Sequence, residues 1–102
     1  MSERFRVANT SQLNPGQGML IRIEGRELAL FNIGGDFYAI ANRCTHSGGP
    51  LAEGRLHQTT VTCPWHGAQF NVTTGKICGG PAVTEVDTYP VHVEDRSIYV
   101  EL

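Results

Sequence analysis

Two short segments, each carrying one cysteine and one histidine, constrain this chain more than any other feature of its sequence. Cys44 and His46 form a C-x-H pair, and Cys63 and His66 form a C-x-x-H pair sixteen residues further on. The whole chain has three cysteines and four histidines, so abundance of these residues does not explain the matched pairs. Glycine and proline accompany both pairs, which is typical of a backbone that turns tightly around a bound group. The two segments therefore indicate a metal centre held between two loops.

Two kinds of metal centre fit these four ligands. Two thiolates and two imidazoles can hold a tetrahedral zinc ion. They can also hold a [2Fe–2S] cluster in which one iron takes both cysteines and the other takes both histidines. Zinc sites usually draw each close pair from one residue type, whereas each segment here mixes the two types. The spacing favours the two-iron centre over zinc, and both over four unconnected side chains on polar loops.

Short strand signals fill most of the remaining sequence. Three strands are expected, at Met19–Glu24, Glu27–Ile33 and Phe37–Ala41. Turns would fall at Gly25-Arg26 and at 34–36, where glycine allows the tight reversals of hairpins. The only helical signal is a short turn near 11–13, because Pro15 and two glycines interrupt the segment that follows.

The last fourteen residues alternate apolar and polar side chains on both sides of the turn sequence EDRS. This pattern predicts a closing hairpin over 89–102. Its buried side would comprise Val91, Val93, Ile98, Val100 and Leu102. Repeated short strands with regular turns predict an all-β protein, a small antiparallel sandwich or barrel whose loops carry the chemistry.

Length and charge limit the classes of partner. The 102 residues suit one domain, and the formal net charge is -2, with eight basic and ten acidic side chains and no basic run. Nucleic-acid binding needs clustered Lys and Arg, so we expect no nucleic-acid partner. No apolar run has the length of a signal sequence or of a membrane span. We expect a soluble cytoplasmic protein with no membrane partner.

The sequence around the two pairs closely resembles that of the Rieske [2Fe–2S] family. The resemblance lies in CTHSGGPLAEG at 44–54, CPWHGAQFNVTTGK at 63–76 and GGPA at 79–82. It extends from about Leu30 to the C-terminus without large insertions. It implies a single Rieske domain over 1–102 and one Rieske-type [2Fe–2S] cluster as the cofactor.

The same resemblance assigns the ligands. It implies that Cys44 and Cys63 bind one iron, and that His46 and His66 bind the other at a solvent-facing tip. The implied fold is a Rieske-type antiparallel β-sandwich or barrel with an inserted cluster-binding subdomain at about 42–70.

Four positions depart from the quinol-oxidising members of the family. Those proteins join the two loops by a disulfide, and the matching positions here are Gly49 and Trp65. They also place serine and tyrosine hydroxyls near the cluster sulfurs, where this chain has Ala68 and Phe70. Hydrogen bonds to the sulfurs stabilise the reduced, more negative cluster. Their absence predicts a reduction potential near the low end of the Rieske range of roughly −150 to +300 mV.

In its short length and low expected reduction potential, the chain resembles the Rieske-type ferredoxins of bacterial aromatic-ring dioxygenase systems. This implies an electron carrier, not an enzyme, that passes single electrons from an NAD(P)H-dependent flavoprotein reductase to a terminal dioxygenase. Alternatives are the small Rieske-like subunit of an assimilatory nitrite reductase, the ferredoxin of a di-iron aromatic monooxygenase, and a zinc-stabilised interaction module. Only His57 and His92 remain beyond the proposed ligands, which does not suggest a second, catalytic iron site.

The other candidate residues have simpler interpretations. Cys78 could tune or protect the cluster, but we expect a free thiol that serves as a small core residue. His57 and His92 are expected at the surface. Trp65 either packs or forms part of an apolar rim. The expected mostly uncharged rim around the histidine tip comprises Gly48, Gly49, Pro50, Pro64, Trp65 and Pro81.

Overall fold

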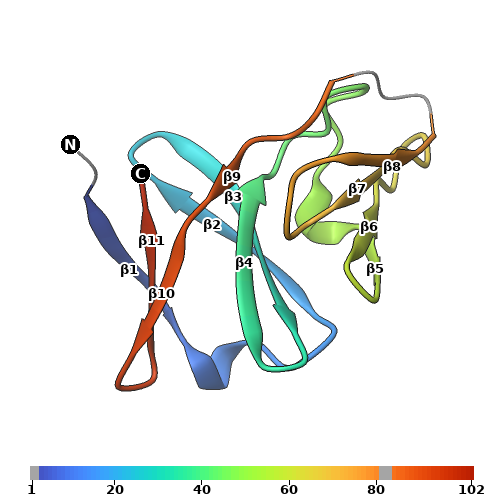
Figure 1. The fold of residues 1–102 in the computed structure, drawn as a ribbon. Helices are drawn as coiled ribbons and strands as arrows, with labels where there is room; N and C mark the ends of the chain where they lie inside the picture. Colours follow the sequence, from blue (N-terminus) through green and yellow to red (C-terminus); the bar gives the residue numbers. More distant parts are fainter. Residues whose placement is uncertain (1–2, 81–83) are drawn as a thin grey trace.

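Three antiparallel β-sheets build the protein, in a computed structural model that describes residues 3–80 and 84–102 (Figure 1). The first sheet has the order β1 (Arg4–Asn9), β11 (Ser97–Glu101) and β10 (Val91–Glu94). The second has the order β2 (Gly18–Ile23), β3 (Arg26–Ile33), β4 (Asp36–Ala41) and β9 (Thr88–Tyr89). The third has the order β5 (Arg55–His57), β6 (Thr60–Thr62), β7 (Gln69–Asn71) and β8 (Ile77–Gly79). The only helical elements in the described residues are two 3-10 turns, Thr10–Gln12 and Leu51–Glu53. The predicted all-β class is confirmed.

Strand β3 is buried on both faces, which explains its unbroken apolar run. Leu28 and Leu30 face a core shared with the first sheet, and Ala29 and Phe31 face a second core shared with the third sheet. All four side chains are at most 1% exposed. Because successive residues of a strand point to opposite faces, a strand between two cores needs apolar residues at every position. The second sheet is therefore the middle layer of the molecule.

The hairpins follow the turn chemistry of the sequence, with a shift of one residue. The first turn is centred on Glu24 and Gly25, with φ of 50° and 75°, instead of on Gly25-Arg26 as predicted. A two-residue turn with positive φ at both positions matches the twist of the paired strands. Placing Gly25 second puts it at the larger of the two positive φ angles. Arg26 is thereby free to begin β3.

The third sheet is an insertion between two strands that pair with each other. In the second sheet β4 lies beside β9, with Ala39 opposite Tyr89 and Ile40 opposite Thr88. The chain leaves β4, forms β5 to β8, and returns to β9 (Figure 1). The sandwich thus presents the whole third sheet, with the loops at its ends, as one projecting unit.

The closing hairpin forms as predicted, but one of its expected core residues is wrong. Ile98 and Val100 are fully buried, whereas Val93 is 48% exposed. The register places Val93 opposite Ile98, so the strand alternation is correct. Val93 lies one residue from the end of β10, beside an open pocket that includes Thr10 and Asp36, and no core layer covers it there.

Within residues 3–80 and 84–102, neither of the helical elements could span a lipid bilayer.

Candidate metal centre

The two cysteine–histidine segments form loops with the same backbone frame. In the first, the Cys44 N–H donates to Gly49 O at 2.9 Å and the Gly48 N–H donates to Cys44 O at 2.8 Å. The second repeats this pattern from Cys63, whose N–H donates to the carbonyl five residues on at 2.8 Å and whose carbonyl accepts from the N–H four residues on at 3.1 Å. The glycine four residues after each cysteine has φ near 77°, a conformation that favours glycine. The sequence motifs therefore encode two matching loops.

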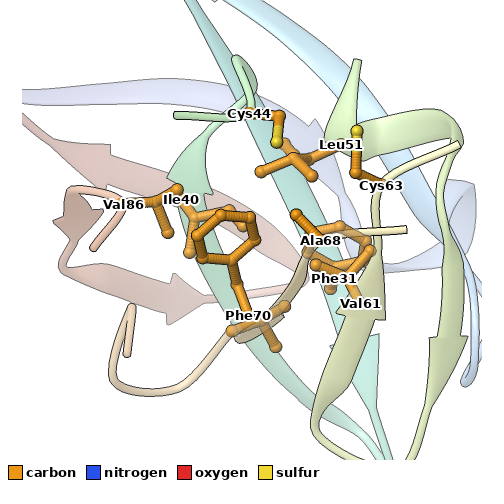
Figure 2. Close-up of a cluster of buried hydrophobic side chains, with 11 residues drawn as sticks. Phe31, Ile40, Cys44, Leu51, Val61, Cys63, Ala68, Phe70 and Val86 are labelled. Carbon is orange, nitrogen blue, oxygen red and sulfur yellow. The ribbon is translucent and has the colours of Figure 1, made fainter. Parts of the chain in front are cut away.

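The two thiols lie beneath these loops, in contact with the core. Cys44 and Cys63 are each 2% exposed, and both belong to the core cluster that underlies the third sheet. Figure 2 shows both sulfur atoms at one end of this cluster, with Leu51 close by and Ala68 and Phe70 beneath. Those three side chains are fully buried. The core thus supplies an apolar floor for a buried pair of candidate sulfur ligands.

The two imidazoles lie outside the thiols, at the exposed ends of the loops. His46 and His66 are both exposed, and their ring centroids are 5.5 Å apart with an interplanar angle of 85°. The histidine stands second after the cysteine in the first loop and third in the second. The matching frames nevertheless bring the two rings edge to face.

The Cys63 sulfur is surrounded by hydrogen-bond donors. Burial raises the pKa of this thiol, but hydrogen bonds from the Trp65 and His66 backbone N–H groups, from Ser47 and from Cys44 outweigh it, and the net pKa is lowered. A lowered pKa favours the thiolate, which is the form that binds metal. The two backbone N–H groups and the Ser47 hydroxyl are donors that a metal-bound sulfur would also accept, whereas Cys44, itself a candidate ligand, would have lost its proton on binding metal.

This donor set fits a two-iron cluster. A Rieske cluster needs one pair of thiolates and one pair of imidazoles on different irons, and the structure separates the donors in this way, into a buried thiol pair and an exposed imidazole pair. Among the described residues no three His, Cys, Asp or Glu side chains gather as they would around one metal ion. The pairing matches the two-iron alternative raised by the sequence.

Gly49 and Trp65, two of the four positions that differ from quinol-oxidising proteins, are in contact. A Cβ atom on Gly49 would lie 3.1 Å from two atoms of the Trp65 indole and 2.7 Å from Cys63 Sγ. Trp65 is 59% exposed, so its ring covers the backbone of Gly49 and still faces solvent. The tryptophan therefore contributes to an apolar rim, and Gly49 itself is buried beneath it instead of lining the surface.

Sequence reasoning missed several residues that hold the first loop in place. The buried Asn42 accepts hydrogen bonds from the Leu51 N–H at its carbonyl, at 2.7 Å, and from the Ala52 N–H at its Oδ1, at 2.8 Å. Thr45 Oγ1 donates to Thr84 O at 2.5 Å, which joins the loop to the segment before β9. Asn42 stands two residues before Cys44, but an asparagine beside a turn gives no signal of a buried anchor.

Arg43 modifies the expected uncharged rim. A Cβ atom on Gly48 would lie 3.2 Å from Arg43 Nε, so the guanidinium runs along the first loop. Pro64 is exposed and Pro50 is partly buried. Pro81, the remaining predicted rim residue, lies outside the described residues. The described rim thus combines apolar groups with one cation.

Three remaining candidates lie away from the two pairs. Cys78 is exposed, so the predicted core role is wrong: it alternates with Ile77, which packs against the core, on the three-residue strand β8. His57 is exposed, as predicted. His92 is only partly exposed, because its Nε2 lies 3.0 Å from Glu101 Oε1.

Comparison with known proteins identifies the family. The profile of the family described as Rieske [2Fe–2S] domain matches residues 3–90, which begins earlier than the resemblance read from the sequence. Over 88 residues the chain is 46% identical to the 3-phenylpropionate/cinnamic acid dioxygenase ferredoxin subunit of Escherichia coli (strain K12), covering 84% of this chain and 83% of the relative.

Solved structures agree with the sequence relatives. The ferredoxin of carbazole 1,9a-dioxygenase from Nocardioides aromaticivorans IC177 has a TM-score of 0.92 at 34% identity, and 95% of each chain is covered. A chain from a complex of reduced oxygenase and oxidized ferredoxin in carbazole 1,9a-dioxygenase has a TM-score of 0.90 at 33% identity, with 95% of this chain and 91% of that chain covered. The fold is therefore that of the Rieske ferredoxins.

Proposed function

Because the chain belongs to the Rieske [2Fe–2S] domain family, we propose that it is the ferredoxin of an aromatic-ring dioxygenase system. It carries one Rieske-type [2Fe–2S] cluster, which when bound supplies the reversible uptake and release of a single electron. It is an electron-transfer component and not itself a catalyst. The relatives at 46% identity are named as dioxygenase ferredoxin subunits, and they support this assignment.

The four sequence-predicted ligands are assigned to the cluster. Cys44 and Cys63 would hold one iron, and His46 and His66 the other. The observation that carries this assignment is the placement of two buried thiols beneath two exposed imidazoles on matching loops. We take residues from about 42 to about 70 as the cluster-binding subdomain, and β8, which pairs with β7, completes the inserted sheet beyond this range.

Buried residues of the site exclude water from the sulfurs, and exposed residues face a partner. Leu51, Ala68 and Phe70 exclude water from the sulfur side, because all three are fully buried against it. The exposed imidazole edges leave a short path to a partner bound at the rim. Trp65 and Pro64 offer that partner an apolar surface, and a small interface of this kind suits a transient encounter.

Two partners follow from this role. The electron donor is an NAD(P)H-dependent flavoprotein reductase, and the acceptor is the terminal oxygenase of the same system. The structure of a similar ferredoxin with its oxygenase supports the second. We place the protein in the cytoplasm, where NAD(P)H is available to the reductase.

The test is an anaerobic redox titration of the purified protein followed by EPR. We expect a Rieske-type signal that appears on reduction below about −100 mV, close to the low end of the family range. The structural reason is that Ala68 and Phe70, which replace the hydroxyl-bearing residues of quinol-oxidising proteins, donate no side-chain hydrogen bond. Such a potential suits a carrier supplied from NAD(P)H.

Two results would contradict the proposal. A protein that binds zinc and shows no EPR signal would be an interaction module. A Rieske signal at clearly positive potential would indicate quinol-linked chemistry instead of dioxygenase supply.

A further inference from the structure

Ser47 connects the two ligand loops through a sulfur atom. It belongs to the first loop, and its Oγ lies 3.6 Å from Cys63 Sγ in the second loop, within hydrogen-bonding range for the larger sulfur atom. Both groups are at least partly buried, so water competes weakly for either of them. No other serine or threonine hydroxyl has a described contact with the sulfurs of Cys44 or Cys63; Thr60 contacts the exposed Cys78 instead.

The direction of this hydrogen bond depends on whether the Cys63 sulfur carries a proton. The Gly49 N–H donates to Ser47 Oγ at 3.4 Å, which occupies a lone pair of the hydroxyl oxygen. The oxygen keeps a second lone pair, so between a hydroxyl and a protonated thiol either group could donate. A metal-bound cysteine is a thiolate and has no proton to donate, so Ser47 must be the donor when the centre is loaded.

We propose that Ser47 raises the reduction potential of the cluster by donating a hydrogen bond across the loops to the Cys63 sulfur. The inference rests on the proposed function, because it needs a cluster bound through Cys63. Reduction adds negative charge to the cluster, and a donor to a ligand sulfur stabilises the reduced form more than the oxidised form. Ser47 thus partly replaces, from the opposite loop, the hydroxyls that Ala68 and Phe70 lack.

The position of Ser47 gives the contact a second consequence. The loops have no disulfide between positions 49 and 65, since these are Gly49 and Trp65. The Ser47–Cys63 contact is a side-chain link between the loops at the level of the buried sulfurs. Ser47 is therefore a positioning residue as well as a donor, and a test must separate these two roles.

The experiment compares the potentials of loaded variants by EPR-monitored titration. Ser47→Ala removes the hydroxyl, while Ser47→Thr and Ser47→Val form a pair of nearly equal volume that differ in a hydroxyl. We expect Ser47→Ala to destabilise the reduced form relative to the oxidised form about tenfold, which is a fall of about 59 mV for a one-electron couple. Ser47→Val should fall similarly, and Ser47→Thr should stay near the wild-type potential. Ser97→Ala is the control, because this serine accepts from Arg6 Nε at 3.1 Å on the first sheet.

Each outcome shows whether a shift in potential comes from the Ser47 hydroxyl or from a change in side-chain volume. Equal potentials for Ser47→Ala and wild type, or equal shifts for Ser47→Thr and Ser47→Val, would overturn the inference. If Ser47→Ala fails to bind a cluster, the Thr and Val pair still gives the answer. Absence of a Rieske signal from the wild type would instead contradict the proposed function, so the two failures are distinguishable.

Discussion

At position 49 the lack of a side chain lets the two cysteine–histidine loops approach each other. The backbone of Gly49 lies under the Trp65 ring and beside Cys63 Sγ, and its φ is not in the left-handed region. The need for glycine here comes from contact and not from backbone conformation. Any side chain would have to displace the Cys63 sulfur or the Trp65 ring.

Gly49→Ala should therefore destabilise the loaded protein. The added methyl group would lie 2.7 Å from Cys63 Sγ, and overpacking of this kind costs roughly 1–3 kcal/mol. Urea unfolding followed by the visible absorption of the cluster measures the change in the free energy of unfolding.

Gly79→Ala is the matched control for this substitution. A Cβ atom at Gly79 would meet only the end of the Gln69 side chain, with Oε1 at 2.9 Å, and that flexible group can move. We expect a change below about 0.5 kcal/mol. Equal losses for the two variants would show that contact with the sulfur and the indole is not the cause.

Single residues also show what the sequence could predict of the site. The cysteine and histidine pairs are visible because each residue type has few other uses on a polar loop. Ser47 and Asn42 are not visible, since their roles depend on a sulfur and a backbone segment from other parts of the chain. The predicted burial of Cys78 is wrong, because its burial depends on which face of a three-residue strand it occupies.

Among the elements, the hairpin between β10 and β11 has an unfavourable turn. Its central residues Asp95 and Arg96 have φ of 48° and 69°, and a non-glycine residue in this region costs roughly 1–2 kcal/mol. The turn between β2 and β3 has similar angles but places Gly25 second. The same geometry is thus formed by two sequences, one with two non-glycine residues at positive φ and one with a single such residue, Glu24.

Exchanging the second residue of each turn should move stability in opposite directions. Arg96→Gly is expected to raise the free energy of unfolding by about 0.5–1 kcal/mol, and Gly25→Arg to lower it by about 1–2 kcal/mol. Both turns lie in sheets outside the inserted one (Figure 1), so the EPR spectrum should not change. Thermal or urea unfolding gives the free energies. A loss of stability in Arg96→Gly would mean that the arginine side chain contributes more than its backbone conformation costs.

The predictability of an element follows from its length and its number of buried faces. The strands within 18–41 were predicted to within one residue, because long apolar runs lie between clear turn signals. Strand β1 was not predicted, since its exposed Arg4 and Arg6 alternate with Phe5 and Val7, which are only partly buried. Strands β5 to β8 have three residues each, too few for a periodic pattern to be recognised.

The molecule as a whole has two hydrophobic cores, and only one of them lies at the candidate metal centre. One core lies under the third sheet and includes Cys44 and Cys63, and the other joins the first two sheets and includes Ile98 and Val100. Both cores contribute to stability, but only the first contacts the candidate ligands.

A pair of valine truncations tests this division. Val61 and Val100 are both fully buried, one in each core, so Val61→Ala and Val100→Ala should each lower the free energy of unfolding by about 1.5–3 kcal/mol. Val61 lies beneath the apolar floor of the two thiols (Figure 2). Only its truncation should therefore alter the EPR line shape or the visible circular dichroism of the cluster. Equal spectral changes in both variants would show that the cores act as one unit.

The pairing of Glu3 with Leu102 has a practical consequence for protein engineering. The Glu3 N–H donates to Leu102 O at 3.2 Å, and the Leu102 N–H donates to Glu3 O at 2.9 Å, at the edge of the molecule away from the third sheet (Figure 1). A few added residues could close this gap, and new ends could be opened at the exposed turn of Gly34 and Gly35. A circularly permuted chain would keep both imidazole edges accessible. So would a chain tethered at the Glu3–Leu102 edge to an electrode or a fused reductase.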